Sequence, residues 1–194
     1  MNATPATDFA AVRARLGARA REEGLLDIAI ARHDAPDGPL LLAATEVGLV
    51  RVALAPEPED AVLQRLAEAI SPRIMRAPHP ALETARRELD AYFAGALTTF
   101  TVPLDRRLSR GFRRAVLDAT AAIPYGATAS YAQVAAAAGN PRAARAAGTA
   151  LATNPLPIIV PCHRVLRSGG EIGDYLGGTP MKEHLLAMEA AVTR

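Results

Sequence analysis

The side chains most able to do chemistry in this chain stand together at Cys162, His163 and Arg164, within the segment IIVPCHRV at 158–165. Cys162 is the only cysteine among 194 residues. A thiolate is a nucleophile, and nearby imidazole or cationic groups lower the pKa of a thiol, so this pattern indicates a reactive cysteine. The alternative is that Cys162 packs as a small apolar residue. If the chain is extended after Pro161, adjacent side chains point to opposite faces, and a water or a bend must connect His163 with the sulfur.

A carboxylate that could orient the imidazole lies near the end of the chain. Residues 180–192 predict a helix in which Leu185 and Leu186 share their face with Glu189. A buried carboxylate needs a partner. His163 is the candidate, because a carboxylate on one ring nitrogen fixes the tautomer and leaves the other nitrogen available as a base. The alternative is a salt bridge between Glu189 and one of the arginines.

Three helices are predicted before the cysteine, and the last two of them are short. Helix 111–123 follows Ser109, a candidate N-cap. The next helix spans 130–138, and its first and fourth residues have the spacing of a capping box. After Gly139, an asparagine and a proline begin the helix 141–152. Two short helices joined by a tight turn with glycine are typical of a helix-turn-helix motif.

Arginine is concentrated in the same part of the chain. Residues 106–167 carry nine arginines against one acid, Asp118, a formal charge of +8; because the whole chain carries +2, the remainder sums to −6. A basic segment beside an acidic remainder is typical of a protein that binds a polyanion such as nucleic acid, and a solvated basic face is the alternative.

The second short helix has few side chains with which to read bases. Arg142 and Arg145 are its only long polar groups, and they alternate with small residues such as Ala147. Major-groove recognition needs polar side chains that reach base edges. Small residues instead allow close backbone approach, and an isolated arginine suits insertion into a minor groove or a base stack. The alternative is an alanine-rich helix packed in a core.

The first half of the chain predicts a small antiparallel sheet with helices. In chain order, the expected elements are helix 8–23, strands 27–32, 37–45 and 48–54, helix 59–70, a short strand or loop at 71–80, helix 81–94, and an edge strand at 98–104. In the first helix Phe9, Val12 and Leu16 have helical spacing and are expected to pack against the protein. The composition then turns basic, so we place the boundary between two domains, 1–104 and 105–194, at that point.

Cysteine usage and the chain's beginning bear on compartment and cofactors. One cysteine allows no internal disulfide and no four-cysteine zinc site, which suits a reducing cytosol. The first 24 residues contain no long apolar run, so neither a signal peptide nor a membrane span is expected. His33 and His79 lack metal-ligand spacing and are expected at the surface. We therefore expect a cytoplasmic protein with no metal and no cofactor. We also expect it to be a monomer in solution.

Several spaced segments carry a resemblance to a known family. The stretch 130–165, the sequence DYLGG at 174–178 and the sequence KEHLLAMEA at 182–190 strongly resemble the O6-alkylguanine-DNA alkyltransferases, also called methylated-DNA–protein-cysteine methyltransferases. The resemblance is close over 123–190 and looser over 27–103. It implies an α+β fold: a ribonuclease H-like N-terminal domain, here with an extra N-terminal helix, and a mostly helical C-terminal domain with a winged helix-turn-helix-like motif.

The resemblance also implies a reaction and the roles of several residues. A methyl or other alkyl group would move irreversibly, in a single turnover, from O6-alkylguanine or O4-alkylthymine in double-stranded DNA to Cys162. His163 and Glu189 would form a relay that makes the thiolate through a water. Asn154 would brace the turn that carries the cysteine, and Tyr131 would donate to guanine N3 and so improve the leaving group.

Further residues would contact the DNA and the base. Arg145 would fill the gap that the flipped nucleotide leaves. The other residues implied at the minor groove are Arg142, Ala143, Ala144 and Gly148. The residues implied at the base pocket are Pro157, Val165, Tyr175 and Leu176. Leu176 departs from the family, whose members often have a small residue there, so it could narrow the pocket.

Two other functions are compatible with parts of this pattern. A DNA-binding regulator would use the helix-turn-helix and keep Cys162 for packing, but the second helix has little with which to read sequence. A thiol hydrolase would use a Cys/His/Glu relay on a soluble acyl substrate, but the basic segment and Arg145 would then have no role.

Overall fold

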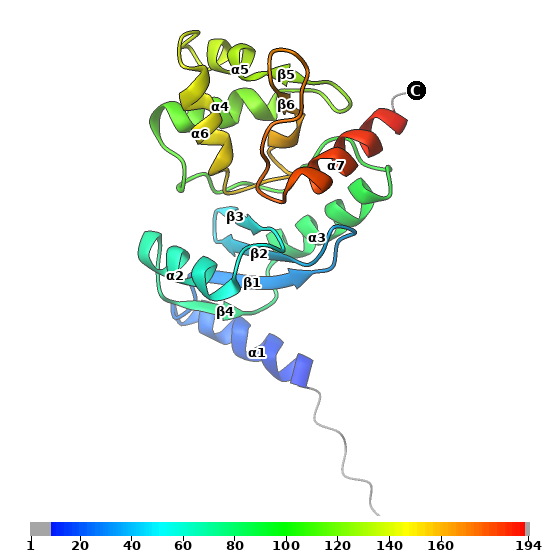
Figure 1. Cartoon of the computed structure of the whole chain (residues 1–194). Helices are drawn as coiled ribbons and strands as arrows, with labels where there is room; N and C mark the ends of the chain where they lie inside the picture. Colours follow the sequence, from blue (N-terminus) through cyan, green and yellow to red (C-terminus); the bar gives the residue numbers. More distant parts are fainter. Residues whose placement is uncertain (1–8, 193–194) are drawn as a thin grey trace, which may run out of the picture.

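The computed structural model describes residues 9–192, without the side chains of residues 9, 10 and 13 (Figure 1). The beginning of the predicted helix at residue 8, and the side chain of Phe9, therefore lie outside the described part. The elements are α1 (Phe9–Glu22), β1 (Ile28–His33), β2 (Leu40–Thr45), β3 (Gly48–Ala53), α2 (Glu59–Ala69), β4 (Ile74–Arg76), α3 (Pro80–Phe93), α4 (Gly111–Ala121), β5 (Ala129–Ser130), α5 (Tyr131–Ala137), α6 (Ala144–Ala152), the 3-10 helix η1 (Cys162–Arg164), β6 (Val165–Leu166) and α7 (Thr179–Val192).

The first half builds a four-stranded mixed sheet in the order β3-β2-β1-β4. The three predicted strands are confirmed, and β1, β2 and β3 are antiparallel neighbours. The sheet is not wholly antiparallel, because β4 forms in the segment expected as a strand or loop and pairs in parallel with β1. Parallel pairing needs a crossover, and α2 lies in the connection from β3 to β4. Three residues of strand carry too little periodicity to indicate that direction.

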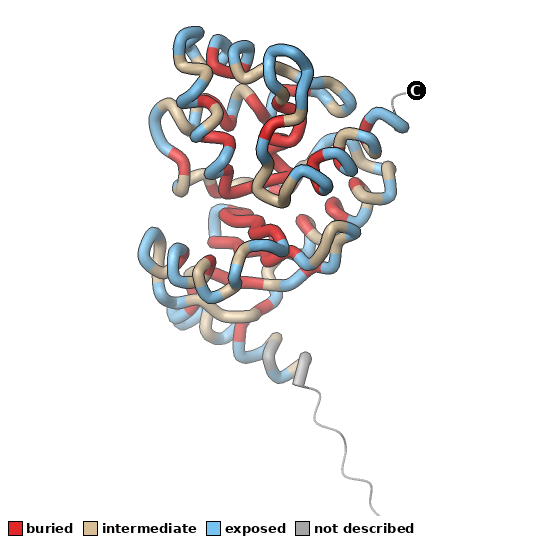
Figure 2. Tube along the Cα trace, viewed as in Figure 1, coloured by how far each residue is buried: buried red, intermediate tan, exposed pale blue. Residues whose placement is uncertain are grey.

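The two faces of the sheet belong to different cores. Leu41 and Ala43 point to the core that α2 covers, while Leu40 and Leu42 point to the core shared with α3. A β-bulge between β2 and β3 beside Ala43 shifts the register of β3. The larger of the two cores continues into the second half of the chain, and buried segments of both halves face each other in Figure 2.

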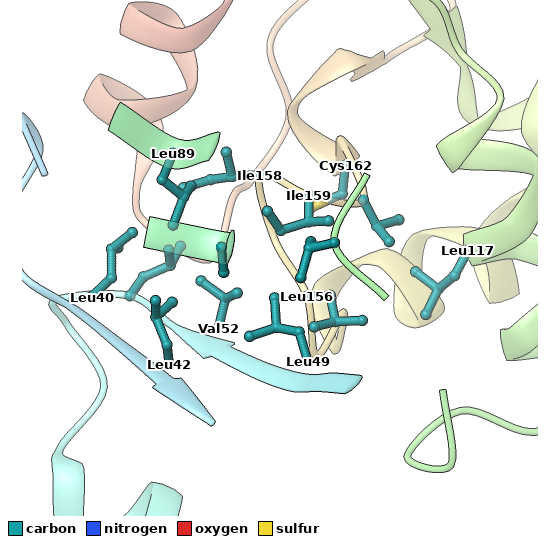
Figure 3. Packing of buried hydrophobic residues seen from close by; sticks show 14 of the residues in the cluster. Leu40, Leu42, Leu49, Val52, Leu89, Leu117, Leu156, Ile158, Ile159 and Cys162 are labelled. Carbon is teal, nitrogen blue, oxygen red and sulfur yellow. The ribbon is translucent and has the colours of Figure 1, made fainter. Parts of the chain in front are cut away.

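The second half is mostly helical and packs directly on the sheet. Its helices α4, α5 and α6 contact one another, and the short strands β5 and β6 pair in parallel. Leu49 and Val52 of β3 lie in one cluster with Leu156 and Ile158, which follow α6 (Figure 3). The α+β fold is confirmed, and the two halves share one continuous hydrophobic core.

Two elements of the first half differ from expectation. The segment 98–104 is not a strand. Leu104 forms only an isolated β-bridge with Leu49, in which Leu49 N donates to Pro103 O at 2.8 Å. Proline has no N–H to continue a ladder. His33, predicted at the surface, is buried against α3 with its Nε2 3.5 Å from Asp90 Oδ1.

Helix α1 forms as predicted but packs by a different face. Val12 and Leu16 are 46% and 57% exposed. Gly17 instead faces the protein, and a Cβ there would lie 2.6 Å from Ala77 Cβ. Helical spacing identified the apolar stripe of Val12 and Leu16, but α1 packs through Gly17, because a residue without a side chain lets the helix approach Ala77 closely. Within residues 9–192, no helix has the length and apolarity needed to cross a membrane, and no cluster of His, Cys, Asp and Glu side chains suits a metal ion.

Candidate active site

Cys162 begins the 3-10 helix η1, and its side chain reaches a cavity although the residue is only 5% exposed. The cavity has a volume of about 620 Å³. Tyr131, Arg145, Tyr175 and Leu176 line it together with the cysteine. These residues come from α5, α6 and the loop before α7, so the fold brings together side chains from three separate elements.

The turn between α6 and the cysteine is fixed from within by Asn154. Its Nδ2 donates to Val160 O at 2.9 Å and to the Cys162 sulfur at 3.2 Å, and its Oδ1 accepts from Leu156 N at 3.0 Å. Ile158, at the middle of this turn, has a φ of +73° and is buried. A β-branched residue adopts that conformation only where the surroundings impose it. The sulfur is therefore held by a rigid turn.

The environment of Cys162 favours the protonated thiol. Burial raises its pKa to about 11, while the hydrogen bond from Asn154 and the charge of Lys182 act in the opposite direction. Lys182 is itself buried on α7, and its Nζ donates to Val165 O at 2.7 Å. Because the thiolate is the reactive form of a cysteine, any reaction through this sulfur would require a base that removes its proton.

His163, the next residue, is buried and paired with a carboxylate. Its Nε2 lies 2.9 Å from Glu189 Oε1, and its Nδ1 has no hydrogen-bond partner among the described residues. The carboxylate accepts from the Nε2–H tautomer, which leaves Nδ1 as an acceptor. Burial lowers the pKa of His163, and Glu189 only partly offsets this, so the surroundings favour the neutral ring.

Glu189 satisfies both interpretations of its sequence pattern. It is buried, pairs with His163, and also accepts from Arg164, whose Nε lies 2.9 Å from Oε2. Tyr92 of α3 donates to Oε1 at 2.6 Å, and Gly126 N donates to Oε2 at 3.1 Å. Burial raises the pKa of Glu189, but the hydrogen bonds from His163 and Arg164 outweigh it and lower the pKa to about 2. The carboxylate therefore stays charged.

The sequence did not predict two of the residues around the site, Tyr92 and Lys182. Tyr92 ends the buried stripe of α3, and Lys182 lies on the same face of α7 as Leu185 and Glu189. Helical spacing alone could have marked Lys182 as a buried cation on the same face of the helix as Glu189. Nothing in the local sequence indicates that Tyr92 reaches across to another domain.

Two of the four residues predicted at the base pocket line the cavity, and two do not. Tyr175 and Leu176 line the cavity, whereas Pro157 and Val165 do not. Pro157 is buried in the turn before the cysteine, and the Val165 carbonyl is occupied by Lys182. Tyr131, whose pKa is raised by burial, places its hydroxyl beside Gly173, where a Cβ would lie 2.8 Å away.

The helix pair beside the cavity begins differently from expectation. The capping box of Ser130 and Gln133 is present at α5. Helix α6 begins at Ala144 and not at residue 141, because the Asn140 side chain accepts from Arg142 N at 3.3 Å and keeps the chain in a turn. Likewise, Arg110 and not Ser109 precedes α4, without a side-chain cap.

The implied DNA residues lie on and before α6. Ala144, Arg145 and Gly148 line the cavity that Cys162 reaches, while Arg142 is exposed and Ala143 half-buried in the preceding turn. The large positive charge of this segment is partly neutralised within the protein.

Two arginines of the segment, Arg106 and Arg114, pair with Asp118. In contrast, Arg145 and Arg167 are exposed and line the cavity together with one exposed acid, Asp174, so a net positive charge remains at its mouth. Fold and site together define a class: a two-part α+β protein that presents one buried thiol, with its own His–Glu pair, at a cavity edged by a basic helix.

Comparison with known proteins gives the family. The domain family "6-O-methylguanine DNA methyltransferase, ribonuclease-like domain" matches residues 29–106, and "6-O-methylguanine DNA methyltransferase, DNA binding domain" matches residues 111–191. The chain belongs to this family of 6-O-methylguanine DNA methyltransferases.

Individual relatives cover most of the chain. A methylated-DNA–protein-cysteine methyltransferase of Mycobacterium bovis is 42% identical over 80% of this chain and 88% of its own. The protein of the same name from Methanosarcina acetivorans is 37% identical over 81% of this chain and 96% of its own. The crystal structure of Mycobacterium tuberculosis OGT in complex with DNA is similar with a TM-score of 0.72 and 36% identity, over 86% of this chain and 94% of that one.

Proposed function

We propose that this chain repairs alkylated DNA directly, by transferring the alkyl group from O6 of guanine to the sulfur of Cys162. The observation that carries the proposal is the single thiol at the cavity, held by Asn154 and backed by the His163–Glu189 pair. The relatives' names describe the same transfer to a cysteine.

The chemistry divides between base, nucleophile and leaving group. His163 Nδ1 takes the thiol proton through a water, and Glu189 stabilises the resulting imidazolium. The thiolate attacks the alkyl carbon; the S–C bond forms as the C–O6 bond breaks. Tyr131 donates a hydrogen bond to guanine N3 as the C–O6 bond breaks, and the guanine anion then takes a proton at N1 from water, which balances the proton that His163 removed from the thiol. The thioether is stable, so each molecule reacts once.

DNA would be bound through its minor groove. In this proposal α5 and α6 act as a helix-turn-helix, with the small residues of α6 against the DNA backbone and Arg145 inserted where the nucleotide has flipped into the cavity. Flipping costs a few kcal/mol, and the contacts of the inserted arginine offset part of it. O4-alkylthymine is a second substrate in the same pocket.

The remaining expectations stand as part of the proposal. Residues 1–104 and 105–194 form its two domains, and the two matched domain families, 29–106 and 111–191, support a division near that point. We expect a monomer that works in the cytoplasm, where one reduced cysteine persists.

One assay tests the proposal against its rivals. The protein is incubated with duplex DNA that carries isotope-labelled O6-methylguanine, and label on the protein is counted. We expect transfer of at most one equivalent, located at Cys162 by peptide mass spectrometry and lost in Cys162→Ser. Repeated turnover on an acyl substrate would indicate the hydrolase, and tight DNA binding without transfer would indicate the regulator.

A further inference from the structure

The turn that carries Cys162 is held not only from within but also from the first domain, at the open edge of the sheet. Strand β3 ends the sheet order, so its outer backbone groups need partners. Val52 N donates to Pro155 O at 2.9 Å. Asn154 and Pro155, the residues that begin the active-site turn, therefore dock on the edge of β3.

Arg51 reinforces this docking from the neighbouring position on β3. The residue is 9% exposed, and Nη1 donates to Val52 O at 3.0 Å within its own half, to Pro155 O at 3.1 Å and to Asn154 O at 3.4 Å. The other arm, Nη2, binds Glu57, and Glu57 also accepts from Arg65 at 3.0 Å. The planar guanidinium thus spans from a carboxylate of its own domain to two carbonyls of the other domain.

We infer that Arg51 is a positioning residue for the reactive thiol, acting through Asn154. The path is short: Arg51 holds the Asn154 backbone, and the Asn154 side chain donates to the Cys162 sulfur at 3.2 Å. The inference rests on the proposed transfer to Cys162, and it assigns a role in that reaction to the sheet of the first domain.

The geometry explains why arginine is needed. A buried cation requires partners on every donor. Arginine supplies two arms in a rigid fork, whereas lysine supplies one point of charge that cannot reach the carbonyls and Glu57 together. Without the fork, the turn keeps the backbone hydrogen bond from Val52 N to Pro155 O but loses the side-chain anchor at the Asn154 carbonyl, and the hydrogen bond to sulfur becomes one of several conformations.

Loss of that hydrogen bond has a defined effect on the thiol. The amide of Asn154 stabilises the thiolate, so its displacement lowers the thiolate population. The other polar groups around the sulfur are Lys182 on α7, Tyr131 on α5, Tyr175 and the neighbouring His163, and these are unchanged in the variants below.

The test uses Cys162 as its own reporter, since the chain has no other cysteine. The rate of carbamidomethylation by iodoacetamide is measured against pH by intact mass, for wild type and Arg51→Met. One hydrogen bond to a charged group corresponds to a rate roughly 10-fold lower at a pH below the thiol pKa. Transfer from O6-methylguanine DNA should fall by a similar factor. Arg65→Met, which also removes an arginine from Glu57, is the matched control and should match wild type.

A double-mutant cycle separates positioning from general damage. In an Asn154→Ala background the route to sulfur is already absent, so Arg51→Met should change the thiol rate less than about 2-fold. An equal loss in both backgrounds, or wild-type rates in folded Arg51→Met, would overturn the inference.

Arg51→Lys and Glu57→Gln, which retain more of the buried network, carry the same test if Arg51→Met does not fold; each should lower the thiol rate when Asn154 is present and should change it less than about 2-fold in the Asn154→Ala background. If the wild-type protein does not accept alkyl groups from DNA, the proposed function is wrong. The iodoacetamide rates still test the role of Arg51 in that case.

Discussion

At the scale of single residues, Glu189 has more hydrogen-bond and ion-pair partners in the site than its sequence pattern predicted. It holds the tautomer of His163, compensates the buried Arg164 and accepts from Tyr92. Removing one partner of a buried charged network leaves the others uncompensated, which costs about 3–5 kcal/mol. Glu189 therefore stabilises the fold as well as orienting His163.

The low pKa of Glu189 predicts how stability depends on acid. The carboxyl has a pKa of about 2 in the folded protein, against an ordinary value of 4.5. The folded state therefore binds this proton less readily, so the carboxylate stabilises it above about pH 4.5, and that contribution, on the order of 3 kcal/mol, is lost as the pH falls toward 2.

Urea unfolding at about pH 6 and about pH 3 measures this loss. Glu189→Gln should be less stable at the higher pH, and its stability should fall less between the two. Glu183→Gln, an exposed change on the same helix α7, is the control and should keep the wild-type dependence. An unchanged acid dependence in Glu189→Gln would contradict the assignment.

At the scale of elements, the loop between β6 and α7 closes one wall of the cavity and sets where Tyr131 can lie. Gly173 is not in the left-handed region of backbone conformation, so alanine meets no backbone strain there. Its Cβ would, however, lie 2.8 Å from the Tyr131 hydroxyl and 3.6 Å from the ring. Only the hydroxyl collides.

This geometry predicts that Gly173→Ala displaces Tyr131, the proposed leaving-group donor. Because a shift of about 1 Å in a positioned group can cost up to 100-fold, we expect alkyl transfer to slow by roughly 10-fold or more. In a Tyr131→Phe background the collision is absent, and Gly173→Ala should have little further effect. Rate measurements on the four proteins test this; equal slowing in both backgrounds would show that the loop acts otherwise.

Helix α6 carries a prediction about flipping. Arg145 is exposed at the cavity, so Arg145→Ala should slow repair in duplex DNA by roughly 10–100-fold, the equivalent of a few kcal/mol of lost flipping energy, and should leave reaction with the free base nearly unchanged. Arg114→Ala, which removes an arginine paired with Asp118, is the control. Equal effects on duplex and free base would remove the flipping role.

Sequence patterns and the structure agree where contacts are local or periodic. The capping box at Ser130, the strands and the burial of Glu189 all follow from spacing within one element. The docking of Tyr92 and Arg51 on the second half spans 71 to 104 residues of sequence, and no local periodicity encodes such a contact. Periodicity also identified an apolar stripe on α1 without indicating that Gly17 would be the packed face.

At the scale of the whole molecule, the two halves share one hydrophobic core. Leu49 on β3 is fully buried in the cluster that includes Leu156 and Cys162 (Figure 3). Apolar residues of the first domain thus form the floor on which the active-site turn rests. Separating the halves would expose that surface to water, at roughly 25 cal/mol for each Å².

A shared core predicts one unfolding transition that links the sheet to the thiol. Leu49→Ala removes buried methyl groups and leaves a cavity, so it should destabilise the whole protein by about 2–5 kcal/mol. The change lies in the first domain, yet Cys162 should become accessible to labelling at a lower urea concentration. The loss in free energy of unfolding measured by this labelling should equal the loss measured by hydrogen exchange in β1 and β2. Val47→Ala, two positions away in the exposed turn, should stay within about 0.5 kcal/mol of wild type. Two separate transitions, with Cys162 labelling unaffected by Leu49→Ala, would mean that the domains unfold independently and that the sheet does not support the active-site turn.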